Sequence, residues 1–207
     1  MKKLLFIIAL VSFCFTVNAQ VQFGAKAGLN LASMTGDDSV GLDGRTSLHF
    51  GITTEIEISD SFSLQPELTY SGQGYTADYE FDDFESGTVR GEITGRVNYL
   101  NLPVMAKFYV AESFSLEFGP QIGFLMSAEE NDYDTTFGSE TYDIKEDLKS
   151  TDFSLNFGAG YKLDSGLNFG LRYNMGLTDV SDNSLSEDGT TVDIKHGVFQ
   201  VSVGYTF

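Results

Sequence analysis

HGVFQVSVGYTF, residues 196–207, ends the chain. Apart from Val198, its apolar and aromatic side chains fall on one parity, which comprises Gly197, Phe199, Val201, Val203, Tyr205 and Phe207. Alternation with a period of two is the pattern of a β-strand whose two faces meet different surroundings. A strand of this kind with a terminal aromatic residue is typical of a transmembrane β-barrel, where alternate residues meet lipid and lumen. We therefore interpret Tyr205 and Phe207 as a C-terminal insertion signal for the barrel assembly machinery.

The N-terminus has the pattern of an export signal. Residues 1–3 are Met-Lys-Lys, residues 4–15 are apolar, and residues 17–19 are a small-residue cleavage motif. We expect residues 1–19 to be a removed signal peptide and residues 20–207 to form one outer-membrane β-barrel domain. The single cysteine, Cys14, lies in this signal, so disulfide, thiolate-metal and cysteine-nucleophile chemistry would be excluded from the mature chain.

Charge and hydropathy narrow the class of protein further. Loss of Lys2 and Lys3 with the signal would leave 10 basic residues against 30 acidic ones, a net charge of about −20. Such a charge opposes binding to nucleic acid, because its phosphates need Lys and Arg to neutralise them. After the signal, no apolar run approaches the roughly 20 residues of a spanning helix, so strands would have to make any membrane crossing.

Eight segments alternate in this way along the mature chain: 21–31, 48–58, 62–73, 99–108, 114–124, 153–163, 167–175 and 196–207. Their connections alternate between short ones, near 59–61, 110–113 and 164–166, and long ones, roughly 33–47, 77–95, 127–150 and 179–195. The pattern predicts an all-β fold, an eight-stranded antiparallel up-and-down barrel with short periplasmic turns and long external loops. Pro66, Pro103 and Pro120 interrupt three of the segments, and we expect them at local bulges or strand ends.

A soluble β-sandwich or lipocalin-like barrel is the alternative, because half-buried strands also alternate. It would bury the large Phe and Leu side chains inside. The opposite parity here is rich in Gly, Ser, Asn, Gln and charged residues of both signs. That composition favours a narrow polar lumen with an apolar surface toward lipid.

Four motifs resemble, in order, those of the PorT-like outer-membrane β-barrel family. They are LQPELTYSGQG (64–74), NYLNLPVMAKFY (98–109), FGPQIGFLM (118–126) and FGAGYKLDSGLNFGLRYNMGLTDV (157–180). The resemblance covers nearly all of the mature chain and implies an eight-stranded barrel in the outer membrane of Gram-negative bacteria. It also implies a candidate role, because the namesake branch of the family assists a protein secretion system.

The inward parity carries four basic and four acidic side chains: Lys26, Glu55, Glu57, Glu67, Lys107, Glu117, Lys162 and Arg172. The interior of an eight-stranded barrel is just wide enough for side chains to fill, so these charges would be desolvated and would need partners. The equal count predicts a salt-bridged network that holds the barrel closed. A gated path for protons or small ions, or a carboxylate pair acting as acid and base, is the sharper alternative.

Twenty-two of the 30 acidic residues fall in the long connections. They predict a solvated external surface, with a protein partner or bridging divalent cations as the functional alternative. His49 and His196 are the only histidines, too few and too separated for a zinc site, and no nucleophile-elbow motif is present. We expect no cofactor, no metal site and no catalytic residues.

The sequence thus predicts a monomeric barrel of the cell outer membrane, surrounded by outer-membrane lipid, with a structural or interaction role. The alternatives are a porin-like conduit for small solutes, an accessory component of a protein secretion system and, least favoured, a membrane-embedded hydrolase.

Overall fold

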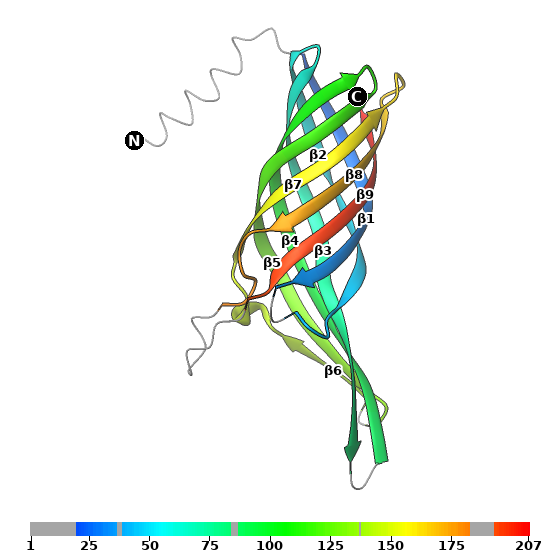
Figure 1. Ribbon diagram of the computed structural model, residues 1–207, viewed down its shortest axis with the longest axis vertical. Coiled ribbons are helices and arrows are strands. Elements are labelled where there is room, and N and C mark those ends of the chain that lie inside the picture. The colour runs from blue at the N-terminus through cyan, green and yellow to red at the C-terminus, as the bar shows by residue number, and fades with distance from the viewer. Residues whose placement is uncertain (1–19, 37–38, 84–86, 137, 183–192) are drawn as a thin grey trace, which may run out of the picture.

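The computed structural model describes residues 20–36, 39–83, 87–136, 138–182 and 193–207 of the chain. The predicted signal peptide therefore lies outside the described residues. Within them, nine strands and one short 3₁₀ helix are present (Figure 1): β1 Val21–Thr35, β2 Asp43–Ser59, β3 Phe62–Asp83, β4 Gly87–Ala111, β5 Phe114–Asp134, β6 Gly138–Asp143, η1 Lys145–Asp147, β7 Thr151–Lys162, β8 Leu167–Gly176 and β9 Lys195–Thr206.

Eight of the described strands close into a ring, and every pairing is antiparallel. Their order is β4-β3-β2-β1-β9-β8-β7-β5, and pairing of β4 with β5 completes the circle. The first and last strands are neighbours, with Gly24 opposite Thr206. Every other pair in the ring joins strands that follow one another along the chain, if β6, which lies outside the ring between β5 and β7 in sequence, is left out. The predicted up-and-down barrel is therefore confirmed.

The distribution of side chains is inverted relative to that of a soluble protein. Large apolar residues cover the outside of the ring, where Phe23, Leu48 and Ile52 are 62%, 64% and 60% exposed. The buried residues are largely polar or charged, including Asn30, Glu67 and others on the inward parity. An apolar exterior of this extent needs lipid around it, so the soluble alternative is excluded. No helix of the described residues is long and apolar enough to cross a bilayer.

The barrel is much taller on one side than on the other. Strands β3, β4 and β5 continue past the ring, and β6 adds to the edge of β5, so that a sheet protrudes from one end of the barrel (Figure 1). Most of the segments predicted as the loops 77–95 and 127–150 is therefore hydrogen-bonded strand. Antiparallel pairing between neighbouring strands continues through these segments, well beyond the predicted strand ends.

The short connections, after β2, β4 and β7, lie at the opposite end, together with the C-terminus (Figure 1). In outer-membrane barrels short turns face the periplasm, which places the protruding sheet outside the cell.

The three prolines do not mark bulges or strand ends, so that prediction was wrong. Pro66, Pro103 and Pro120 lie inside β3, β4 and β5; each is unpaired with one neighbouring strand, but the register is the same on either side of it. The register shifts of the ring occur elsewhere, for instance between Glu57 and Ser59. The long neighbouring ladders hold the strands in place around positions that lack an N–H donor.

Candidate functional site

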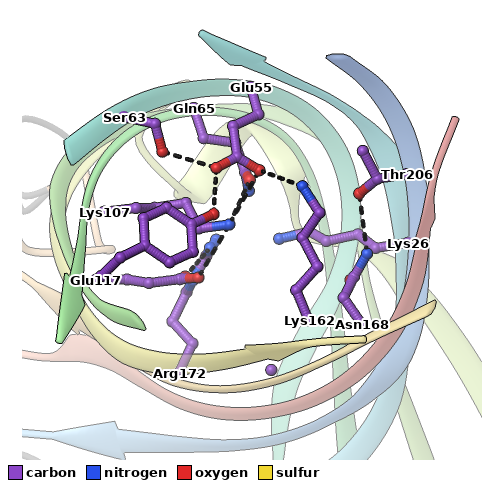
Figure 2. Close-up of polar contacts among 12 residues, drawn as sticks. Lys26, Glu55, Ser63, Gln65, Lys107, Glu117, Lys162, Asn168, Arg172 and Thr206 are labelled. Atoms are coloured by element: carbon purple, nitrogen blue, oxygen red, sulfur yellow. Dashed lines mark hydrogen bonds and ion pairs between the residues drawn. The ribbon is translucent and has the colours of Figure 1, made fainter. Parts of the chain in front are cut away.

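The barrel interior contains a continuous chain of ion pairs (Figure 2). Seven of the eight predicted lumen charges alternate in sign along it, in the order Lys162, Glu55, Lys107, Glu117, Arg172, Glu67 and Lys26. The residues come from β1, β2, β3, β4, β5, β7 and β8, and so the network ties together seven of the eight strands of the ring.

Glu67 is the most enclosed member, and its side chain is completely buried. The two terminal guanidinium nitrogens of Arg172, Nη1 and Nη2, donate to it at 2.9 Å, and Lys26 Nζ donates at 2.5 Å. Gln65 Nε2 adds a further hydrogen bond to Glu67 Oε1 at 2.8 Å. Arg172 also reaches Glu117 at 3.0 Å. Two cations and one amide thus satisfy one buried carboxylate, as its desolvation requires.

Glu55 is the second centre of the network, nearer the periplasmic end. It accepts hydrogen bonds from Ser63 Oγ at 2.7 Å, from Lys107 Nζ at 3.3 Å and from the Tyr109 hydroxyl. Lys162 Nζ approaches the same carboxylate at 3.6 Å. Figure 2 shows the side chains of Lys107 and Lys162 converging on Glu55 from different walls of the barrel.

Glu57, the eighth predicted charge, joins the network through an amide instead of an ion pair. Lys162 Nζ donates to Gln22 Oε1 at 2.7 Å, and Gln22 Nε2 donates to Glu57 Oε1 at 2.6 Å. The structure therefore connects all eight residues, four of each sign. Gln22, Gln65 and Tyr109 are further members of the site that the sequence does not single out, because parity indicates which side chains face inward and not which of them touch.

A neutral layer of amides, hydroxyls and histidine lies above the charges, toward the outside. Asn30 is its centre, because it donates to Ser71 Oγ at 2.9 Å and to the Gly72 carbonyl at 2.6 Å while its own Oδ1 accepts from Gln200 at 2.9 Å. His49 Nδ1 lies 2.7 Å from the same Oδ1. This layer was not predicted, since each member is an ordinary polar residue on the inward parity.

An apolar cap closes the lumen at its outer end. Val97, Tyr99, Leu125 and Ala128 form a buried cluster, and Ile144 and Leu148 pack against it from the segment around η1. The Tyr99 hydroxyl lies 3.1 Å from His196 Nε2 below the cap. One cavity among the charged side chains has a volume of about 40 Å³, room for little more than a few waters. The buried side chains of the network thus occupy the centre of a barrel whose interior is just wide enough for them.

The described part of the chain contains no group of three or more His, Cys, Asp and Glu side chains that could hold a metal ion. Its two histidines are buried in the barrel and bond to Asn30 and Tyr99.

The protruding sheet has its own polar geometry, built on tyrosines that lie across glycines. The Tyr79 ring covers Gly91 and donates its hydroxyl to Asp132 at 2.7 Å. One step nearer the barrel, Tyr75 covers Gly95 and donates to Glu130 at 2.6 Å. Glycine on the middle strand leaves the space that each ring occupies.

Its hydrogen bond to Asp132, together with partial desolvation and nearby carboxylates, raises the pKa of Tyr79 from its ordinary value of 10.0 to about 12. The higher pKa widens the alkaline range over which the phenol stays protonated and can donate to Asp132.

The C-terminal aromatic residues lie at the periplasmic end of the outer surface. Tyr205 and Phe207 pack edge to face, with ring centroids 5.3 Å apart, and the Phe207 amide donates to the Phe23 carbonyl at 2.8 Å. Their side chains are 45% and 79% exposed, which leaves them available to lipid.

A closed antiparallel ring with an apolar exterior and a filled polar interior defines an eight-stranded outer-membrane β-barrel protein. Residues 17–182 match the sequence model of the outer membrane protein beta-barrel domain family, and the chain belongs to that family. It resides in the cell outer membrane.

Two solved structures share the fold at low sequence identity. Ail, the attachment invasion locus protein of Yersinia pestis, is 14% identical, with a TM-score of 0.53 over 91% of this chain and 99% of Ail. Neisserial surface protein A is 10% identical, also with a TM-score of 0.53, over 91% of this chain and 99% of that one. No curated protein sequence matches the chain.

Proposed function

We propose that this protein is an interaction protein of the cell surface, a closed barrel that anchors the protruding sheet and presents it to a partner outside the cell. The observation that carries the proposal is the pair of unpaired edges on that sheet. Among the described residues, β3 between Ala77 and Asp82 has β4 as its one strand partner, and β6 pairs with β5 alone. Unpaired main-chain N–H and C=O groups on such edges can bind an extended chain.

The side chains beside these edges define the chemistry of the partner. Glu129, Glu130, Asp132 and Asp134 lie on β5, and Glu140 and Asp143 on β6 beside it. All residues of β6 are exposed. An extended segment rich in Lys and Arg would gain both main-chain hydrogen bonds and opposite charge here.

A direct test is photo-crosslinking in intact cells. A photoreactive residue at Thr141, on β6, should yield an adduct larger than the barrel. The same residue at Leu171, which faces lipid and is 51% exposed, is the matched control and should yield none. Absence of an adduct from Thr141 and from Tyr79 on β3 would refute the proposal.

A role in protein secretion, which the resemblance to the PorT-like family implies, is the second candidate and would use the opposite end of the barrel. An open vestibule of about 820 Å³ lies there, and Glu57, Asp60, Glu112 and Asp164 are among its lining residues. A crosslink from Asp164, with none from Thr141, would favour this candidate.

The filled lumen argues against a porin-like conduit, and we propose neither a transport nor a catalytic role. Reconstituted in a planar bilayer, the mature chain should give a flat current trace. Discrete conductance steps would restore the channel hypothesis, because they would require a continuous aqueous path through the charged layer.

A further inference from the structure

An apolar cavity of about 310 Å³ lies at the outer mouth of the barrel, above the cap. Its walls come from distant parts of the chain, namely Met34 at the end of β1, Tyr75 of β3, Val97 of β4, Ile144 and Leu148 around η1, and Val180. Val40, at its margin, is 90% exposed, so the cavity opens toward the outside.

Main-chain hydrogen bonds fix these walls in place. The Ile144 amide donates to the Ala128 carbonyl at 3.1 Å, the Lys149 amide donates to Val180 at 2.9 Å, and the Val180 amide donates to Ile194 at 2.8 Å. Leu148 also forms an isolated bridge with Ser181. The segments are thus held by their backbones while their side chains leave the space between them unfilled.

The cavity is open on its outer side, so its volume is to be judged against that of surface binding sites. It falls at the lower end of the range for small-molecule sites, roughly 300 to 1,000 Å³. We propose that the cavity binds a small, uncharged, predominantly apolar molecule that reaches it from outside the cell. The proposal is independent of the protruding sheet.

The lining sets the chemical class of the ligand. No Asp, Glu, Lys or Arg is among the lining residues, so a charged group would be desolvated there without a partner. The Tyr75 hydroxyl is already committed to Glu130. The Ser181 hydroxyl is then the remaining side-chain hydroxyl of the lining, enough for one hydrogen bond. Below the cavity, the Tyr99 hydroxyl lies 3.1 Å from His196 Nε2 of β9, so buried side chains stand between the cavity and the charged residues.

Methyl NMR on the mature chain in lipid nanodiscs tests the proposal, with indole as an uncharged aromatic probe. The methyl signals of Met34, Val97, Ile144 and Val180 should shift and saturate with increasing indole. Those of Leu171 and Val201, which face lipid, should change linearly without saturation, because there the probe only partitions into the bilayer.

Two variants make the result specific to the cavity. Val97→Phe should fill the space and abolish the saturable shifts, whereas Leu171→Phe, the matched control on the lipid face, should retain them. Retention of the heat-modifiable gel mobility shows that each variant is folded, and Leu148→Phe replaces Val97→Phe if that variant does not fold. Linear shifts at the cavity methyls, or saturation that persists in the folded filling variant, would overturn the proposal.

Discussion

Replacement of Glu67 by Gln should be among the most destabilising single changes in the lumen. The carboxylate is completely buried and holds Lys26, whose side chain is 10% exposed, and Arg172, which is 9% exposed. The variant keeps the side-chain shape but leaves both cations without that anion. Arg172 keeps its contact with Glu117 at 3.0 Å, whereas the pair with Glu67 is the one ion pair that Lys26 forms among the described residues. Breaking a buried pair in this way costs about 3–5 kcal/mol.

The loss can be assigned to the unpaired charge by a double-mutant cycle. Lys26→Met in the Glu67→Gln background removes the stranded cation, and the double variant should recover at least about 1 kcal/mol of the loss. The free energy of unfolding is measured by denaturant titration in lipid vesicles, with heat-modifiable gel mobility as the signal for the folded barrel.

Glu80→Gln is the matched control, because the ion pair between Arg90 and Glu80 is largely exposed on the protruding sheet. It should leave the unfolding midpoint unchanged. If Glu67→Gln were as stable as the wild type, or if Lys26→Met added to its loss instead of offsetting it, the network would not be a paired structure in the membrane.

Three further predictions concern packing, pH and assembly. Gly28→Ala should destabilise the barrel by about 1–3 kcal/mol, because the added Cβ would lie 2.0 Å from the Val201 carbonyl oxygen. In the same unfolding titration Gly170→Ala should be tolerated, because its Cβ meets only the movable Ser202 hydroxyl. The hydrogen bond from Tyr79 to Asp132 should contribute fully to stability below pH 10, where the phenol is protonated in folded and unfolded chains alike. Its contribution should be lost as the pH rises through about 12. The difference between the ultraviolet titrations of the wild type and of Tyr79→Phe gives the midpoint for Tyr79, and a midpoint near 10 would contradict the prediction. Phe207→Ala should lower the amount of folded barrel in the outer membrane, measured on unboiled gels, if the terminal aromatic residue is read during insertion; equal amounts would remove that role.

Much of the fold could be predicted from residue alternation. The parity of β9 separates Phe199, Val201 and Val203 from Gln200 and Ser202, and the structure places the first set outside and the second inside. The same rule placed Glu55 and Glu67 in the lumen. It did not predict the extensions of β3 and β4. Tyr79 and Phe81 still alternate with Glu80 and Asp82 there, but a segment this acidic also suits an external loop, and its pairing depends on the neighbouring strand.

The sequence by itself determined that strands cross the membrane, which face of each strand meets lipid, and that four basic and four acidic side chains enter the lumen. Only the tertiary structure decided which of them touch, that Glu57 is reached through Gln22, and that a buried apolar cluster lies toward the outer end of the barrel. The physical reason is that periodicity fixes the direction of a side chain, whereas its contacts depend on the register between strands and on the tilt that closes the ring.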